Sequence, residues 1–234
     1  MSTTKQQARA AGRWYLLMGL TAPLGLIVVP AQLIVRGDAA ATADRIRASE
    51  WLFRLGIGSE LFHQTIAIFL VLALYRLFKA VNERDAVLIV ILGALVSVPI
   101  MFANVLNSVA ALTLYSHPDF LSGFDSRQLD ELGYLFLRLH SRGIDVASVF
   151  WGLWLFPFGA CVIRSGFIPA VLGVLMMLAG GAYVVSATTA LVLPQLEPVV
   201  SRFIFILQFG EIPIMFWLLI WGARERTSAA QAHA

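Results

Sequence analysis

The stretch LGIGSELFHQTIAIFLVLALY, residues 55–75, decides the fold class of this chain. A membrane-spanning helix needs about 20 consecutive, mostly apolar residues. This stretch has that length, and its polar side chains include Glu60 and His63. A carboxylate at bilayer depth is disfavoured by at least a few kcal/mol on insertion scales, so it is usually paired or turned inward. The stretch therefore predicts a membrane helix with a polar inner face.

Runs of comparable length recur along the whole chain. The chain is 59% hydrophobic and 13% charged, and its mean hydropathy of +0.80 is far above that of soluble proteins. The sequence therefore predicts an all-α, polytopic membrane protein with a six-helix transmembrane bundle at residues 14–223, between cytoplasmic tails at 1–13 and 224–234. The predicted spans are Trp14–Val35, Leu55–Tyr75, Ala86–Tyr115, Val146–Ile163, Pro169–Leu193 and Phe203–Ala223.

Composition also excludes several function classes. The formal charge of +3 is small, and no basic patch with interleaved aromatic residues indicates nucleic-acid binding. Cys161 is the only cysteine, which rules out an intrachain disulfide and a CxxC motif, so we expect a buried thiol there. The GxSxG, HExxH, P-loop and GxGxxG motifs of soluble enzymes are absent. The lipid bilayer is the expected partner, and no cofactor is expected.

The distribution of basic residues favours one orientation. Lys5, Arg9 and Arg13 precede the first span, and an even number of spans puts the turn with Arg76 and Lys79 on the same side. On the opposite side arginines are mixed with acidic residues, although the two Lys/Arg counts are nearly even. The positive-inside rule then predicts both termini in the cytoplasm.

The longer connections fall on the opposite, outer side. A short helix can start at Thr42 within Gly37–Glu50. In Ser126–His140, apolar residues recur at a spacing of three to four, which is typical of an amphipathic helix. We expect the latter helix to lie at the outer interface or to cap the bundle, which would place His140 near the interface.

Polar residues of several spans fall at one depth. At about 1.5 Å per residue, Glu60 lies about 13 Å below Trp51, and Glu211 lies about 12–16 Å down its own span. Asn104 and Asn107 fall in the same range. These positions predict one polar layer slightly outside the midplane, with these further members: His63, Gln208, Ser186, Thr188 and Thr189.

This layer is the candidate functional site. Glu60 and Glu211 are the hypothetical catalytic acid and base, because a buried carboxyl group with a shifted pKa can donate or accept a proton. His63 is the nearest candidate partner of Glu60, whereas Arg54 reaches it only by bending inward. The alternative is a purely structural cluster, since buried polar side chains join membrane helices at roughly 0.6 kcal/mol each. The candidate ligand-binding residues are His63, Asn104, Asn107, Gln208 and His140.

A metal centre receives limited support. Glu60 and His63 have the Glu-x-x-His spacing of di-iron bundles, but such sites need two of these motifs and two further carboxylates. A site for a single metal ion would need His140 and Glu211 as further ligands. Haem ligation by His63 and His140 is disfavoured, because His140 is expected near the interface. We expect no metal.

Several motifs together resemble a known family. Taken as a set from about Arg13 to Gly222, they are similar to the bacterial integral membrane proteins called "domain of unknown function 4386". The resemblance implies a multi-pass bundle and a glutamate in the last span that matches Glu211. Where such proteins often carry Asp near the Glu60 position, this chain has the longer Glu, and His63 departs from the pattern. The motifs are Gly37-Asp38-Ala39-Ala40-Ala41-Thr42-Ala43, Glu50-Trp51-Leu52-Phe53-Arg54-Leu55-Gly56, Leu135-Phe136-Leu137-Arg138-Leu139-His140, Arg164-Ser165-Gly166-Phe167-Ile168-Pro169 with Leu172-Gly173, and Phe209-Gly210-Glu211 through Trp217-Leu218-Leu219.

Three functions stay open at this point, because the family has no established activity. The first is an outward-opening polar pocket that binds or moves a small, largely apolar molecule or protons. The second is an intramembrane acid–base enzyme that uses Glu60 and Glu211, similar in size and carboxylate placement to membrane-bound terpene cyclases. The third is a structural or regulatory membrane subunit, for which protein partners are unknown.

Overall fold

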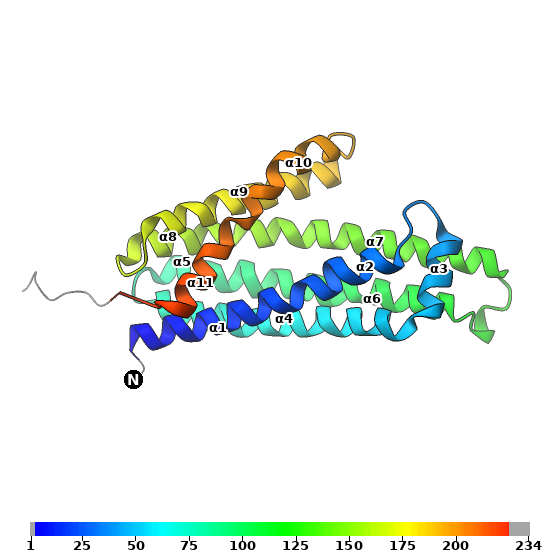
Figure 1. Ribbon diagram of the computed structural model, residues 1–234, viewed down its shortest axis with the longest axis horizontal. Helices are drawn as coiled ribbons and strands as arrows, with labels where there is room; N and C mark the ends of the chain where they lie inside the picture. Colours follow the sequence, from blue (N-terminus) through cyan, green and yellow to red (C-terminus); the bar gives the residue numbers. More distant parts are fainter. Residues whose placement is uncertain (1–2, 225–234) are drawn as a thin grey trace, which may run out of the picture.

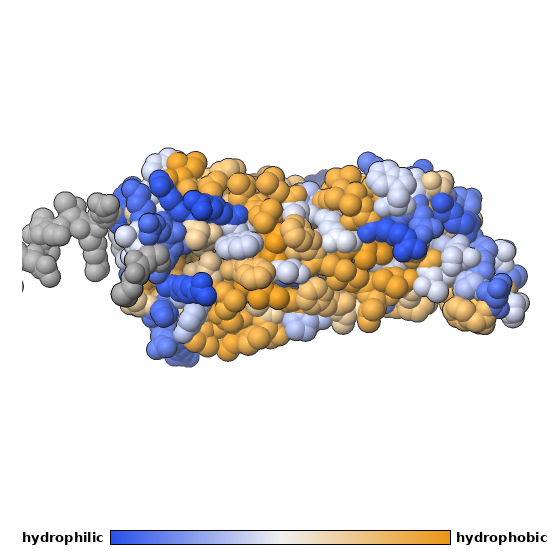
Figure 2. All heavy atoms as spheres, turned by 90° about the horizontal axis from the view of Figure 1, so that it is seen from below, coloured by the Kyte–Doolittle hydropathy of each residue, from blue (hydrophilic) through white to orange (hydrophobic). Residues whose placement is uncertain are grey.

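The computed structural model describes residues 3–224, and within this range the chain is helical with no strand. The helices run roughly along one long axis (Figure 1). The start of the first helix, the α4–α5 turn and the α8–α9 turn lie at one end, which we call the terminal end. The opposite end, with α3 and the longer connections, is called the loop end. Figure 2 shows a broad apolar belt between two hydrophilic ends, as a membrane-embedded surface requires.

Six helical segments of residues 3–224 are long and apolar enough to cross a membrane, which confirms the predicted fold class. Two shorter elements lie at the loop end: α3 (Ala39–Ala48) and the 3₁₀ turn η3 (Asp119–Leu121). The six segments are α1–η1–α2 (Thr4–Pro23, Leu24–Val28, Val29–Leu33), α4 (Glu50–Phe78), α5–η2–α6 (Glu83–Val90, Ile91–Val96, Ser97–Tyr115), α7–α8 (Ser126–Leu153, Leu155–Ser165), α9 (Ala170–Val192) and α10–η4–α11 (Glu197–Gln208, Phe209–Glu211, Ile212–Ile220).

Prolines mark the irregularities inside these spans. The π-helical segments η1 and η2 are followed by Pro30 and Pro99, and the 3₁₀ segment η4 is followed by Pro213. The break between α7 and α8 precedes Pro157 in the same way. A proline cannot donate a backbone hydrogen bond, and its ring clashes with the carbonyl group one turn earlier. Local π or 3₁₀ geometry relieves that clash without ending the span.

Helix ends follow ordinary capping chemistry. Asn82 accepts a hydrogen bond from the backbone of Asp85 at the start of α5, and Asp125 forms a capping box with Gln128 at the start of α7. Gly166 ends α8 with a φ of 69°, a conformation that glycine adopts without strain. These signals hold the turns at both ends of the bundle.

The first and last helical segments begin earlier than the predicted spans. The first helix begins at Thr4 rather than Trp14, so the predicted tail at residues 1–13 is helical from Thr4. The last span begins at Glu197 rather than Phe203, with Pro198 in its first turn, where a missing N–H is tolerated. Of the predicted tail at 224–234, residues 225–234 lie outside the described residues.

The amphipathic segment Ser126–His140 is helical, as predicted, but it is not a separate interfacial element. It forms the first half of α7 and continues without interruption into the fourth span. Its inner face buries Leu129, Gly133, Leu137 and His140, a spacing of about one turn. The expectation of a helix separate from the fourth span was wrong, and its apolar face packs against α6 and α3.

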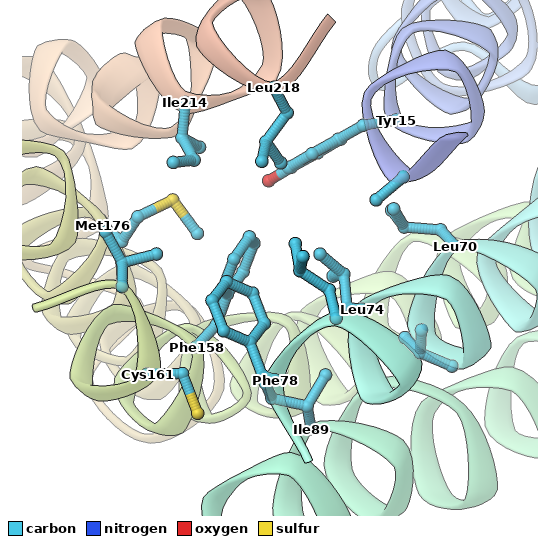
Figure 3. Close-up of a cluster of buried hydrophobic side chains, with 14 of the residues drawn as sticks. Tyr15, Leu70, Leu74, Phe78, Ile89, Phe158, Cys161, Met176, Ile214 and Leu218 are labelled. Atoms are coloured by element: carbon cyan, nitrogen blue, oxygen red, sulfur yellow. The ribbon is translucent and has the colours of Figure 1, made fainter. Parts of the chain in front are cut away.

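Among residues 3–224, two apolar cores hold the bundle. The larger core lies toward the terminal end, where Phe78 and Phe158 meet Met176 and Leu218 among other side chains from all six spans (Figure 3). The predicted buried thiol of Cys161 belongs to it. The smaller core lies at the loop end around Ile46.

Candidate functional site

A buried pair joins the second and fourth spans. The Nε2 atom of His140 on α7 lies 2.9 Å from the Oε2 atom of Glu60 on α4, and both side chains are buried. Gly25 makes room for the pair, because a Cβ atom there would lie 2.7 Å from Glu60 Cγ. The partner of Glu60 is therefore His140, and the expectation of His63 as its partner was wrong.

Two asparagines complete this group from α6. Asn104 donates from Nδ2 to the backbone carbonyl of His140 over 2.9 Å, and Asn107 donates to Asn104 Oδ1 over 3.0 Å. Glu60, Asn104 and Asn107 of the predicted layer thus form one connected set with His140, which we call the Glu60 group. Arg54 takes no part, because it pairs with Glu50 over 2.7 Å.

Glu211 belongs to a different set. The hydroxyl groups of Tyr15 on α1 and Tyr183 on α9 donate to its two carboxyl oxygens, at 2.5 Å and 2.8 Å. Two donors on one carboxyl group reduce the cost of holding it inside the bilayer. The irregular segment η4, which ends at Glu211, directs this side chain between the two tyrosines.

The two glutamates do not share one layer. At about 1.5 Å per residue, Glu60 lies about 27 Å from the terminal end of α4, whereas Glu211 lies about 14 Å from the terminal end of α11. The predicted depth of Glu211 is measured from Phe203, whereas the helix starts six residues earlier, at Glu197. Glu211 is therefore nearer the terminal end than expected.

A cavity of about 370 Å³ lies beside Glu211. Most of its wall is apolar, and side chains of α1, α4, α7, α9 and α11 contribute to it. We call it the Glu211 cavity, and Glu60 is not among its lining residues. Its polar lining residues are Tyr15, His63, Gln64, Ser97, Tyr183 and Glu211.

His63 and Gln64 occupy neighbouring positions on the cavity wall. The Nδ1 atom of His63 lies 3.1 Å from the Met18 carbonyl and 3.5 Å from the Thr21 hydroxyl. A carbonyl only accepts, so Nδ1 carries the proton of a neutral ring and Nε2 is an acceptor. Gln64 is 1% exposed, and its amide nitrogen has no hydrogen-bond partner. A residue of the wall thus has an unpaired donor.

Some of these residues were not found from the sequence, and one predicted residue lies elsewhere. Gln208 is half-buried on α10 and is not a lining residue. Tyr15 was not among the predicted site residues, and it is only the second residue of the predicted span Trp14–Val35. Gln64 is the one of these residues that the sequence could have indicated, because it is a polar residue next to His63 in an apolar run. No sequence pattern pointed to Tyr183.

Metal-ligating residues are not gathered at either place. Among residues 3–224, no group of three or more His, Cys, Asp or Glu side chains is placed to hold a metal ion. The Glu-x-x-His spacing is used differently here, since Glu60 faces His140 while His63 faces the α1 backbone.

The fold and the buried polar residues define the class: a multi-pass, all-helical integral membrane protein. The chain matches the family described as domain of unknown function (DUF4386) over residues 10–222, and it therefore belongs to this family. It is also similar to an uncharacterized protein from Archaeoglobus fulgidus, with 31% identity over 81 residues. That match covers 35% of this chain and 47% of the archaeal protein, so the chain spans about half of that relative. No solved structure matches the chain.

Proposed function

We propose that this protein binds a small, largely apolar molecule with one hydrogen-bonding group in the Glu211 cavity. The observation that carries the proposal is Gln64, whose buried amide nitrogen has no partner on a cavity wall. Leaving a buried donor unpaired costs about 1–3 kcal/mol, which a bound acceptor would recover. The volume of about 370 Å³ also falls within the range of roughly 300–1,000 Å³ for small-molecule sites.

A lipophilic alcohol tests this proposal directly. Full-length protein in phospholipid vesicles is titrated with tritiated farnesol, with protein-free vesicles as the partition blank. We expect saturable binding that unlabelled farnesol displaces and that the hydrocarbon farnesene displaces about tenfold more weakly, a difference of about 1.4 kcal/mol. Binding that does not distinguish alcohol from hydrocarbon would contradict a role for the polar wall.

The chain offers a matched pair of glutamines for the same assay. Gln64→Leu removes the unpaired amide, and the Kd for farnesol should rise by up to about tenfold, since one hydrogen bond contributes about 0.5–1.5 kcal/mol. Gln208→Leu is the control, because Gln208 also lies in a span but not on the cavity wall. Equal effects of the two substitutions would contradict the proposal.

An acid–base enzyme is the second candidate. It is favoured by the carboxyl group of Glu211 and two tyrosine hydroxyls at one apolar cavity. This version relies on Glu211 without Glu60, because the two carboxyl groups belong to separate sets. Farnesol and its terminal epoxide are incubated with the protein, and products are sought by gas chromatography and mass spectrometry. Product formed equally by wild type and Glu211→Gln would contradict acid catalysis by Glu211.

We further propose that the chain lies in a bacterial cytoplasmic membrane with both termini in the cytoplasm. Both lysines of the chain, Lys5 and Lys79, lie toward the terminal end, which supports this orientation. Green fluorescent protein fused to the C-terminus should fluoresce, because it folds in the cytoplasm. A fusion that is dark but fully membrane-inserted would reverse the orientation.

A further inference from the structure

The wall of the Glu211 cavity is not closed on all sides. On its α4 side the lining residues His63, Gln64 and Leu70 are buried. On the α1 and α11 side, Leu20 is 68% exposed, and Ile212 and Phe216 are 38% and 43% exposed. The outer surface of these three apolar side chains marks the open side of the cavity.

Helix packing explains why this side is open. Helix α1 contacts α11 closely at Gly12, where a Cβ atom would lie 2.4 Å from the Leu219 nitrogen. Toward the loop end the two spans diverge, and α10 packs on α9 rather than on α1 (Figure 1). None of the residues of α10 is buried. The gap between the first and last spans is therefore not filled by another described helix.

The surroundings of this gap are apolar. The first span carries no charged residue from Trp14 to Val35, and Glu211 is the one charged residue from Phe203 to Ala223. Both segments belong to helices that are long and apolar enough to cross a membrane. A solute in water would have to cross the apolar belt, whereas a molecule dissolved in the bilayer meets the gap directly.

We infer that the Glu211 cavity is loaded sideways from the bilayer, through a portal formed by Leu20, Ile212 and Phe216. This inference rests on the proposed function and specifies the ligand class as membrane-dissolved lipophilic alcohols. Gln64 has an unpaired donor and His63 an unprotonated nitrogen that can accept, and a hydroxyl group is able both to accept and to donate. The portal replaces the outward-opening entrance predicted from the sequence.

The portal is tested by rates rather than by affinity. In Leu20→Trp a larger side chain stands in the portal, so uptake and release of tritiated farnesol in proteoliposomes should both slow by about fivefold or more at nearly unchanged Kd. The control is Leu106→Trp, because Leu106 on α6 is 66% exposed and does not line the cavity. Equal rates for the two variants would overturn the portal.

A second variant covers the case in which the new tryptophan folds into the cavity and blocks binding. Phe216→Ala widens the portal, so both rates should rise at nearly unchanged Kd, and rates equal to those of wild type would overturn the inference. If wild type itself has no saturable farnesol site, the proposed function fails and the portal fails with it. If the wild type has a saturable site but neither variant changes the rates of uptake and release, the portal alone is contradicted.

Discussion

The His140 imidazole and the Glu60 carboxyl group form a buried pair, with 2.9 Å between Nε2 and Oε2. Asn104 binds the backbone carbonyl of the same histidine, so α4, α6 and α7 meet at one residue. None of these side chains lines the Glu211 cavity. We therefore assign the Glu60 group to helix association, separate from the proposed binding site.

Replacing Glu60 should therefore affect stability more than ligand binding. In Glu60→Leu the buried His140 loses its partner, and the free energy of unfolding should fall by about 1–3 kcal/mol. Glu60→Gln keeps an acceptor and should cost less. Unfolding of the detergent-solubilised protein measures both. Glu50→Leu is the control, since the exposed Glu50–Arg54 pair contributes about 0–1 kcal/mol; an equal loss in Glu50→Leu would contradict the assignment.

Two tyrosines should respond oppositely to loss of the hydroxyl group. Tyr15→Phe removes a donor to Glu211 and should lower the free energy of unfolding by about 1–3 kcal/mol. The Tyr115 hydroxyl is buried without a partner, so Tyr115→Phe should be neutral or stabilising. Thermal unfolding in one detergent compares the two variants. A larger loss for Tyr115→Phe would mean that its hydroxyl has a partner in the folded protein.

The spans could be predicted from the sequence because apolar length alone defines them. The Glu60–His140 pair could not, and the reason is the two-faced character of α7. Hydropathy averages the faces of a helix, so the exposed Arg138 and the half-buried Arg142 hid the buried His140, and the predicted fourth span begins only at Val146. The first half of α7 is amphipathic, so it can be recognised as part of the fourth span only when its inner face is known to pack against other helices.

The same averaging displaced Tyr15. Arg9 and Arg13 set the predicted start of the first span, but the Arg9 side chain extends to donate to the Ile220 carbonyl at the end of α11. A long basic side chain allows its helix to continue while the charge stays near the bundle end. Tyr15 is consequently only the second residue of the predicted span, although it lies well inside the helix beginning at Thr4.

Close contact between the first and last spans should depend on one glycine. A Cβ atom at Gly12 would lie 2.4 Å from the Leu219 backbone nitrogen, so Gly12→Ala must push α1 away from α11. We expect a loss of about 1–3 kcal/mol in the free energy of unfolding, as in other overpacked cores. Gly58→Ala on α4 is the matched control, because its Cβ would meet nothing within 4 Å. Similar unfolding curves for the two variants would contradict this contact.

The loop end should depend on an ion pair between α3 and α7. Arg47 binds both carboxyl oxygens of Asp130, at 2.7 Å and 3.2 Å, and also binds Asp44. The hydrogen bond to Asp130 raises the pKa of Arg47 above its ordinary value, so the guanidinium keeps its charge at any working pH. The Asp130 side chain is 10% exposed and the Asp44 side chain 75%. Water and salt therefore screen the Asp44 contact far more than the Asp130 contact.

Asp130→Asn should lower the free energy of unfolding by about 1–3 kcal/mol, because it leaves the Arg47 charge without its least exposed partner. Asp44→Asn should change it by no more than about 0.5 kcal/mol. Unfolding in detergent at low and at high sodium chloride concentration measures both. The effect of Asp130→Asn should persist at high salt, because ions do not reach a contact that is largely withdrawn from water. Equal effects of the two substitutions, or an Asp130 effect that disappears with salt, would show that α3 is held to α7 by apolar contacts around Ile46 instead.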